Sequence, residues 1–308
     1  MDRSRSGPLG DRAPCLLLAF DDAHELTLGR ALAASMGWPL AVVRRHAFPD
    51  GETRLTLPPE LPAEVVLLRG LHDPNAKLTE VLLAAAGARE LGARRLTLVC
   101  PYLAYMRQDA AFHAGEVVSQ RHVGDFLASV VDRVVTVDPH LHRVASLGEV
   151  LPDTAATALT AAPAIGAFLK RRARGALLVG PDGESSQWVA VAAAHAGLEW
   201  TVAHKVRRGD RRVAVALPAV PFRGRRVVLV DDMISTGRTL AAAARALGRA
   251  GAASVDVAAT HALFVPGAEP AMRRAGIASV WTTDTVPHAT NAIGIASLVG
   301  QALGGRRR

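Results

Sequence analysis

Short runs of hydrophobic residues alternate along the chain with longer segments in which hydrophobic residues recur every three or four positions. The short runs predict strands and the longer segments predict helices, because side chains repeat every second residue in a strand and every 3.6 residues in a helix. The predicted strands cover residues 15–20, 41–44, 65–68, 96–100, 133–137, 176–180, 226–230, 255–260 and 280–281. The predicted helices cover residues 23–36, 78–91, 119–130, 186–196 and 239–250. Strands and helices that alternate in this way are typical of α/β proteins, in which helices cover both faces of a mainly parallel sheet.

The chain is expected to fold as two such units. A length of 308 residues predicts two domains at about 150 residues per domain. Residues 151–162 combine a Pro-Asp turn signal with a segment rich in Ala and Thr, which favours a boundary there. We therefore predict an N-terminal domain over residues 14–155 and a C-terminal domain over residues 156–308, whose last helix can pack back on the N-terminal domain.

Composition excludes several classes of protein. With 50% hydrophobic and 21% charged residues, the chain can fill two cores and is not expected to be disordered. It has no run of about 18 apolar residues for a membrane span and no secretory signal, so we expect a cytoplasmic protein. Three arginines at 306–308 contribute to the net charge of +8. The remaining excess fits anionic small substrates better than nucleic acid.

The most informative segment is residues 227–239. Four hydrophobic residues predict a buried strand, and two carboxylates, Asp231 and Asp232, follow it. A loop of small and hydroxyl-bearing residues then leads into a helix, and its members are Ser235, Thr236, Gly237, Arg238 and Thr239. Such a loop can bind a phosphate through backbone N–H groups, hydroxyls and the helix dipole. The carboxylates suit ribose hydroxyls or Mg²⁺, because an exposed strand–helix turn would not explain adjacent carboxylates at a buried strand end.

This segment resembles the phosphoribosyl-diphosphate (PRPP) motif of the type I phosphoribosyltransferase fold. The motif alone does not distinguish transferases from the synthetase that makes PRPP. Seven further blocks occur in the order typical of ribose-phosphate pyrophosphokinases, at residues 48–52, 101–109, 115–119, 137–140, 180–182, 204–207 and 284–287. The chain therefore resembles this family over about residues 14–305. The resemblance implies two tandem type I phosphoribosyltransferase-like domains, with the ATP side in the first and the PRPP motif in the second.

The resemblance also implies an activity. The enzyme would transfer the β,γ-pyrophosphoryl group of Mg-ATP to the 1-hydroxyl of ribose 5-phosphate and release PRPP and AMP. Ribose 5-phosphate would be bound by Asp231, Asp232 and the loop Ser235, Thr236, Gly237, Arg238 and Thr239. ATP would be bound by Arg107, Gln108, Phe48, Asp50 and Glu52, with Mg²⁺ at His140 and Asp182 and catalytic cations at Lys205 and Arg207.

In the family the loop that corresponds to Phe48, Asp50 and Glu52 comes from a neighbouring subunit. The resemblance therefore implies a homo-oligomer, at least a dimer, with an ATP site shared between subunits. It implies neither nucleic acid nor a membrane as a partner. Two departures from the family pattern stand out: Arg238 replaces the usual Gly of the phosphate loop, and Pro139 precedes His140 where another residue is more usual.

Other interpretations stay open at this point. The segment 48–52 also fits a simple β-turn, His140 a buried strand-end histidine, Asp182 a turn carboxylate, and residues 205–212 a solvated basic hairpin. A non-catalytic regulatory subunit would be expected to lose loop or metal residues, which are all present here. A salvage phosphoribosyltransferase would need one PRPP-type domain and would leave the first 150 residues or so without an explanation.

Overall fold

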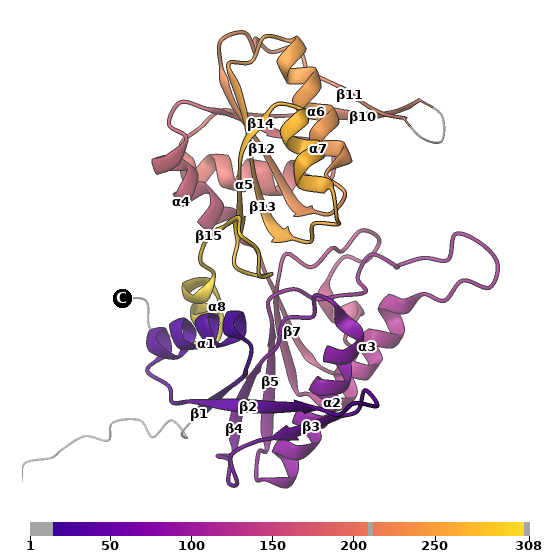
Figure 1. Ribbon diagram of the computed structural model, residues 1–308, viewed down its shortest axis with the longest axis vertical. Helices are drawn as coiled ribbons and strands as arrows, with labels where there is room; N and C mark the ends of the chain where they lie inside the picture. Colours follow the sequence, from indigo (N-terminus) through magenta and orange to yellow (C-terminus); the bar gives the residue numbers. More distant parts are fainter. Residues whose placement is uncertain (1–14, 209–211, 305–308) are drawn as a thin grey trace, which may run out of the picture.

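The computed structural model describes residues 15–208 and 212–304 and confirms the predicted α/β fold. The described residues form two large sheets, one from each half of the chain, and a separate two-stranded hairpin. The two sheets lie one above the other along the long axis of the molecule, and helices pack against each of them (Figure 1). Within the described ranges, no helix is both long and apolar enough to cross a membrane.

The first sheet has seven strands in the order β3-β2-β1-β4-β5-β6-β7. Neighbouring strands are parallel except β2 and β3, which form an antiparallel hairpin. The strands are β1 (Cys15–Phe20), β2 (Leu40–Ala47), β3 (Thr53–Thr56), β4 (Glu64–Leu68), β5 (Arg95–Cys100), β6 (Arg133–Val137) and β7 (Ala155–Leu159). The helices of this part are α1 (Ala23–Met36), α2 (Pro74–Glu90), α3 (Ser119–Val130) and the short 3-10 helix η1 (Leu147–Glu149).

The second sheet has six parallel strands in the order β15-β14-β13-β12-β8-β9. They are β8 (Leu177–Gly180), β9 (Trp200–Val202), β12 (Arg226–Ile234), β13 (Ser254–Ala262), β14 (Ile277–Thr283) and β15 (Asn291–Ile293). The helices are α4 (Ala162–Arg172), α5 (Ser186–Ala196), α6 (Arg238–Arg249), α7 (Ala268–Arg274) and α8 (Ala296–Ala302). The antiparallel hairpin of β10 (His204–Arg208) and β11 (Arg212–Ala216) projects from this domain (Figure 1).

The hydrophobic pattern does not predict β7, which lies inside the segment where we expect the domain boundary. Its sequence, Ala-Ala-Thr-Ala-Leu, has no run of β-branched residues, and its side chains are half-buried or exposed. It forms a strand because it pairs with β6 over its whole length, from Arg133↔Ala155 to Val137↔Leu159. Pairing with a neighbour thus overrides weak local propensity. The strand order places β7 in the first sheet, and the division of the domains at residue 155 stays a prediction.

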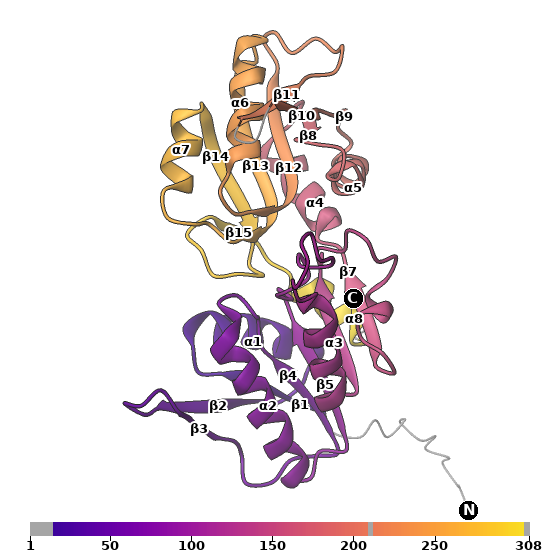
Figure 2. The same cartoon turned by 90° about the vertical axis from the view of Figure 1, so that its right-hand side faces the viewer.

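One hydrophobic cluster continues from the first sheet into the second. It includes Leu17 and Val66 of the first sheet together with Val228 and Ala258 of the second. The last helix, α8, lies against α1 of the first domain (Figures 1 and 2), where a β-carbon added at Gly300 would come within 2.9 Å of the Ser35 hydroxyl oxygen. The end of the chain therefore connects the second domain back to the first.

The carboxyl ends of the strands of both sheets meet between the domains. Asp138, directly after β6, accepts a hydrogen bond of 2.7 Å from Thr260 in the last part of β13. Gly70, two residues after β4, lies near Thr285, two residues after β14: a β-carbon at Gly70 would be 3.7 Å from the Thr285 carbonyl oxygen. Ligands of parallel sheets bind beyond these ends. The space between the two sheets is therefore where a functional site is expected.

At its own carboxyl edge, the first sheet contains a buried ionic cluster. The side chain of Arg69 is fully buried and forms ion pairs with Asp22 (2.7 Å), Glu25 (3.5 Å) and Glu80. Glu25 also accepts a hydrogen bond of 2.8 Å from the Gly70 backbone N–H. Burial nevertheless raises the pKa of Glu25 to about 7, because loss of water outweighs its contacts with Arg69 and Gly70.

We predict that Glu25 makes stability depend on pH. Its pKa in the folded protein, about 7, lies above the ordinary value of 4.5, so between these values the folded protein holds a proton that the unfolded chain has lost. The stability that this proton contributes is complete below pH 4.5 and is lost as the pH rises through 7. Glu25→Gln keeps an acceptor for the Gly70 N–H but cannot titrate. Urea denaturation between pH 5 and 8 should show a flatter stability profile for the variant, by about 2–3 kcal/mol over the range.

Glu64→Gln is the matched control, because Glu64 is the first residue of β4 in the same sheet, its side chain is 43% exposed, and its carboxylate lies 3.6 Å from Arg95. Its pH profile should follow that of the wild-type protein. Equal slopes for the wild type and Glu25→Gln would show that Glu25 is ionised in the folded protein throughout this range.

Candidate active site

The two adjacent carboxylates of the sequence motif lie within β12 and not behind it. The sequence predicts that this strand ends at residue 230, but the structure continues it to Ile234. Asp231 pairs with Ala259 and Met233 pairs with His261 on the parallel strand β13. Strand β12 extends this far because β13 has the same length and supplies backbone pairing partners as far as Ile234. As a result Asp232 is buried, at 4% exposure, while Asp231 is partly exposed.

A short loop connects β12 to α6 and lines the site with hydroxyl groups. Ser235, Thr236 and Thr239 all contribute to the wall of one pocket. Gly237 adopts a left-handed conformation with a φ of 64°, and α6 begins at the next residue, Arg238. This turn directs the loop and the positive end of the helix dipole at the same space. Backbone N–H groups, hydroxyls and a helix N-terminus together suit an anion such as phosphate.

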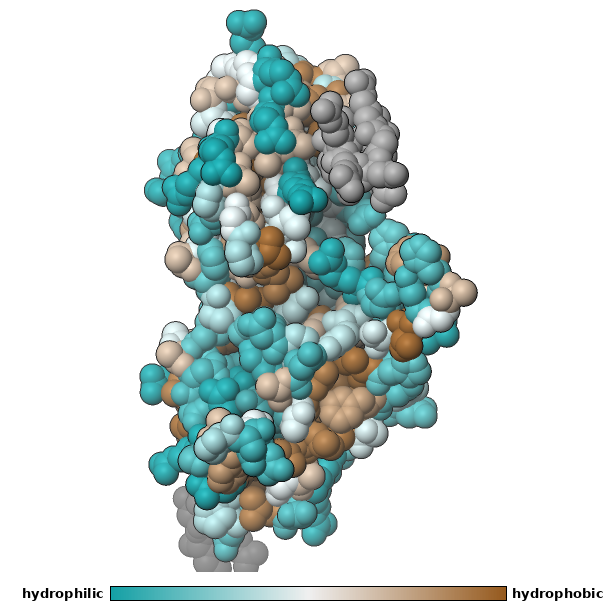
Figure 3. All heavy atoms as spheres, turned by 45° about the vertical axis from the view of Figure 1, so that its right-hand side comes forward, coloured by the Kyte–Doolittle hydropathy of each residue, from teal (hydrophilic) through white to brown (hydrophobic). Residues whose placement is uncertain are grey.

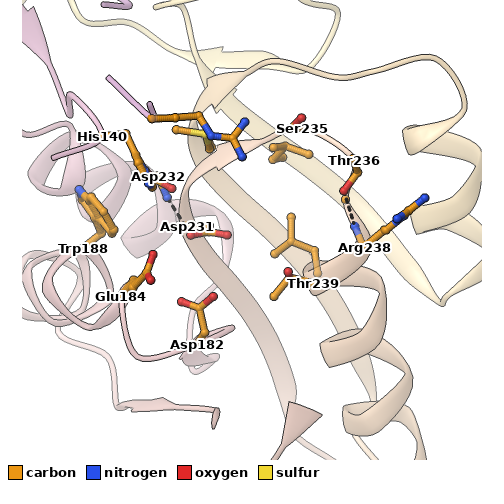
Figure 4. A pocket seen from close by; sticks show the side chains of 15 residues that line it. His140, Asp182, Glu184, Trp188, Asp231, Asp232, Ser235, Thr236, Arg238 and Thr239 are labelled. Atoms are coloured by element: carbon orange, nitrogen blue, oxygen red, sulfur yellow. Dashed lines mark hydrogen bonds and ion pairs between the residues drawn. The ribbon is translucent and has the colours of Figure 1, made fainter. Parts of the chain in front are cut away.

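The pocket lies between the two domains (Figure 4). Its volume is about 160 Å³. The first domain contributes Arg107, which follows β5, and His140, which follows β6. The second domain contributes the ends of β8 and β12 and the loop before α6. The pocket brings together ten of the residues that the sequence singles out: Arg107, His140, Asp182, Asp231, Asp232, Ser235, Thr236, Gly237, Arg238 and Thr239.

A hydrogen bond between His140 and Asp232 crosses the domain interface. The His140 Nδ1 atom lies 2.7 Å from Oδ2 of Asp232. This contact raises the pKa of His140, because the buried carboxylate favours the charged imidazolium. Burial, together with the negative charges of Asp232 and Asp182, raises the pKa of Asp231 well above its usual range. The charged form of Asp231 is therefore disfavoured unless a positive charge lies beside it.

The oxygen ligands of the pocket fit a divalent cation that also binds a substrate. Within residues 15–208 and 212–304, no group of three or more His, Cys, Asp or Glu side chains is arranged to hold a metal ion by itself. Mg²⁺ in phosphate-binding sites usually takes one or two carboxylates and completes its shell with water and phosphate oxygens. A cation placed among Asp182, Asp231 and Asp232 would offset the burial and the mutual repulsion that raise the pKa of Asp231.

A second ionic network borders the pocket on the side of the first domain. Arg143 donates a hydrogen bond of 2.6 Å to Asp109, whose side chain is 2% exposed. His142 Nε2 lies 2.9 Å from Oε1 of Glu184, across the domain interface. Glu184 and Trp188 also line the pocket, and the sequence analysis did not select either of them. Glu184 could have been selected from the sequence, because it lies two residues after Asp182 in the same loop.

Other predicted residues lie outside this pocket. Phe48 and Asp50 lie in the turn between β2 and β3, with Glu52 just before β3. Figures 1 and 2 show this hairpin projecting sideways from the first domain. Gln108 donates a hydrogen bond of 3.3 Å to the carbonyl oxygen of Ala110. Lys205 and Arg207 lie on β10, but their side chains lie outside what the structure describes.

Comparison with known proteins covers both halves of the chain. Residues 17–130 match the family described as the N-terminal domain of ribose phosphate pyrophosphokinase, and residues 159–296 match the phosphoribosyl transferase domain family. The chain is 36% identical over 290 residues to a ribose-phosphate pyrophosphokinase of Methanopyrus kandleri, with 93% of this chain and 98% of that protein covered. It is 34% identical over 278 residues to a ribose-phosphate pyrophosphokinase of Halobacterium salinarum, with 90% and 97% covered.

A solved structure shows the same fold. The phosphoribosylpyrophosphate synthetase from Mycobacterium smegmatis aligns with a TM-score of 0.79 and 24% sequence identity. The alignment covers 94% of this chain and 97% of that one. The chain therefore shares its fold with that protein over nearly its whole length.

We predict that Gly237 is needed for the shape of the phosphate loop. Its positive φ is unfavourable for any residue with a β-carbon, and an added β-carbon would lie 2.6 Å from the sulfur of Met272. Met272 is itself buried, so it has little room to move. Gly237→Ala should lower the free energy of unfolding by about 1–2 kcal/mol. Calorimetric titration with inorganic phosphate should show roughly tenfold weaker binding, because the loop N–H groups no longer converge.

The control is Gly248→Ala, in the last turn of α6, where no atom lies within 4 Å of the added β-carbon. Alanine is a better helix former than glycine, so this variant should be as stable as the wild type or slightly more stable. Unchanged phosphate binding by Gly237→Ala would mean that the loop is not the anion site.

Proposed function

We propose which residues carry out the reaction in this chain, which belongs to the ribose-phosphate pyrophosphokinase family. The reaction transfers the pyrophosphoryl group of ATP to the 1-hydroxyl of ribose 5-phosphate and yields PRPP and AMP. The observation that supports our assignment most strongly is the convergence in one pocket of a hydroxyl-lined loop, a group of carboxylates and a cation, Arg107, from the other domain. A sugar phosphate and a polyphosphate need these three kinds of group side by side.

The loop before α6 is proposed to hold the 5-phosphate of the sugar. Its hydroxyls and backbone N–H groups surround the space in front of the helix N-terminus, where anions are favoured. Arg238 replaces the usual glycine at the first position of α6 and lines the same pocket, so its guanidinium can add a further phosphate contact. Asp231 and Asp232 then face the ribose hydroxyls, because carboxylates accept hydrogen bonds from hydroxyls and repel phosphates.

ATP is proposed to bind on the side of the first domain. Arg107 would pair with the polyphosphate, since a guanidinium donates two parallel hydrogen bonds to phosphate oxygens, and Gln108 would lie beside it. His140 and Asp182 would hold Mg²⁺ together with phosphate oxygens. The pocket carboxylates repel the phosphate groups of the substrates, and Mg²⁺ bound there would neutralise part of the phosphate charge. The protein side chains would thus orient the β-phosphate toward the sugar and keep it apart from the carboxylates of Asp231 and Asp232.

The hairpin of β10 and β11 is proposed to supply the remaining positive charge. As the 1-hydroxyl oxygen attacks the β-phosphorus and AMP departs, negative charge is redistributed over the phosphate oxygens. Cations that approach these oxygens at that moment lower the barrier. Lys205 and Arg207, two residues apart on one strand, are assigned this role by their match to the catalytic loop of the family.

A single assay tests the proposed function. The purified protein is incubated with Mg²⁺, ATP and ribose 5-phosphate, and AMP and PRPP are quantified by chromatography. The expected result is the release of AMP and PRPP in equal amounts, and of neither product when ribose 5-phosphate is left out. Production of ADP instead of AMP, or AMP without PRPP, would overturn the assignment.

We predict that Lys205 acts mainly on turnover. Lys205 is one of only three lysines beside 33 arginines in this chain. A compact ammonium suits a crowded phosphoryl centre better than a broad, planar guanidinium. A contact made mainly in the transition state affects kcat more than KM. Lys205→Ala should lower kcat roughly a hundredfold, equal to about 3 kcal/mol of barrier, with small changes in KM. Lys205→Arg should recover part of the loss.

The matched control is Lys170→Ala, which removes an exposed lysine at the end of α4. It should leave kcat unchanged. A Lys205→Ala variant that turns over at the wild-type rate would identify the hairpin as an ordinary solvated, basic one.

An ATP site shared between subunits is the proposed role of the β2–β3 turn. Phe48 is 37% exposed in this turn and does not line the pocket that contains Arg107 of the same chain. Further exposed hydrophobic side chains in this domain are Leu82, Leu83, Phe112 and Val117, and Figure 3 shows hydrophobic residues gathered on its surface. Exposed apolar patches of this kind are typical of protein interfaces. We infer that the ring of Phe48 stacks on the adenine bound by a neighbouring subunit.

Mixing two inactive variants tests the shared site. Phe48→Ala and Lys205→Ala each remove one part of it, so each protein alone should be weakly active. If Phe48 comes from a neighbour, a mixed oligomer contains some sites with both residues intact. Activity should therefore rise after subunit exchange, to roughly a quarter of the wild-type value in an equimolar mixture of dimers. A mixture that is no more active than the average of its components would place both residues in one subunit's site.

A further inference from the structure

Asp138 occupies an unusual position at the end of β6, two residues before His140. Its backbone φ is 37°, in the left-handed region that residues with a β-carbon rarely adopt. Its side chain is buried, and the whole residue is 5% exposed. A conformation of this kind persists when surrounding contacts hold it in place, and it often accompanies a functional site.

Both carboxylate oxygens of Asp138 already accept hydrogen bonds. Oδ1 accepts from the indole Nε1–H of Trp188 at 2.9 Å. Oδ2 accepts from the backbone N–H of Ala161 at 2.9 Å and from the hydroxyl of Thr260 at 2.7 Å. The donors belong to α5, to the residue before α4, and to β13. One side chain that follows the first sheet is thus anchored at three points, two of which lie in the second domain.

The backbone of Asp138 is fixed as well. Its N–H donates to the carbonyl oxygen of Leu159 at 2.7 Å. Its carbonyl oxygen lies 3.1 Å from Nε2 of His261, a contact that requires a proton on that nitrogen because a carbonyl can only accept. Burial lowers the pKa of His261, and its other ring nitrogen, Nδ1, lies 2.8 Å from the Thr285 hydroxyl oxygen. Main chain and side chain are therefore held by separate partners.

Pro139 connects Asp138, with its hydrogen bonds, to His140 in the pocket. The proline ring restricts φ to a narrow range, so the orientation of Asp138 is passed on to the next residue with little freedom. That residue is His140, which hydrogen-bonds to Asp232 across the interface. The path from Thr260 to the pocket is therefore short: Thr260, the Asp138 carboxylate, Pro139 and the His140 imidazole.

We propose that Asp138 is a positioning residue for His140, and that Thr260 and Trp188 of the second domain hold it for this purpose. This inference rests on the proposed role of His140 in the pocket. Asp138 does not act as a ligand of substrate in this proposal, because its oxygens are committed to protein donors. Trp188 both lines the pocket and donates to Asp138, so it connects the pocket wall with the anchor.

The test removes one donor and leaves the fold intact. Thr260→Val deletes the hydroxyl that donates to Asp138 and replaces it with a methyl group of similar size. Its control is Thr136→Val: Thr136 is equally buried, lies on β6, two residues before Asp138, and its hydroxyl oxygen has no hydrogen-bond partner. Thr260→Val should lower kcat by roughly tenfold with KM for ribose 5-phosphate nearly unchanged, as expected when a reacting group is misplaced. Thr136→Val should keep the wild-type kcat.

A second variant and a second background separate positioning from stability. Trp188→Phe keeps an aromatic ring but loses the N–H, and it should lower kcat in the same way. In a His140→Ala background, Thr260→Val should have no further effect on kcat, because its effect acts through His140. The proposal would be overturned if Thr260→Val lowered kcat just as much in the His140→Ala background as in the wild type. Equal kcat values for Thr260→Val and Thr136→Val would overturn it as well.

A measurement without substrates keeps the two proposals distinguishable. The NMR chemical shifts of the His140 imidazole at fixed pH should change in Thr260→Val and stay unchanged in Thr136→Val, whether or not the protein makes PRPP. Failure of the wild-type protein to make PRPP would reject the proposed function alone. Unchanged His140 shifts in Thr260→Val would reject the positioning role alone.

Discussion

The contact between His140 and Asp232 joins the two domains at the point where the pocket forms. One partner follows the first sheet, the other lies near the end of the central strand of the second sheet, and the distance between them is 2.7 Å. Neither sheet alone contains the whole pocket: Arg107 comes from one side and the phosphate loop from the other. Docking of the domains at the correct register is therefore a condition for binding both substrates in one place.

Buried polar contacts explain how this register is fixed. Hydrophobic surfaces such as those of α1 and α8 resist separation but tolerate small displacements, since their attraction has little direction. A buried hydrogen bond is directional, and each group left without its partner costs about 1–3 kcal/mol. The network from Thr260 and Trp188 to Asp138 lies beside the pocket, so the interface is most tightly specified where the chemistry requires it.

The sequence predicts the parts of this site that are local in the chain. Asp231, Asp232 and the following loop form one continuous motif, and Arg107, His140 and Asp182 each follow a predicted strand, where parallel sheets place their ligand-binding groups. Glu184 and Trp188 were not assigned in this way, and the position of Asp138 directly after a predicted strand does not reveal what it contacts. Their roles depend on partners that lie 42, 50 and 122 residues away in the chain. The strand β7 was missed for the same reason, because its pairing with β6 decides its conformation.

The carboxyl edges of the two sheets use similar side chains for different purposes. At the first sheet, Asp22, Glu25 and Glu80 surround the buried Arg69, so the protein supplies the opposite charge itself. At the second sheet, neither Asp182 nor Asp231 forms an ion pair with a lysine or arginine of the described residues. Burial, followed by the negative charges of Asp232 and Asp182, raises the pKa of Asp231. The carboxylates at the edge of the first sheet thus contribute to stability. The carboxylates at the edge of the second sheet need a bound ligand to supply the positive charge that they lack.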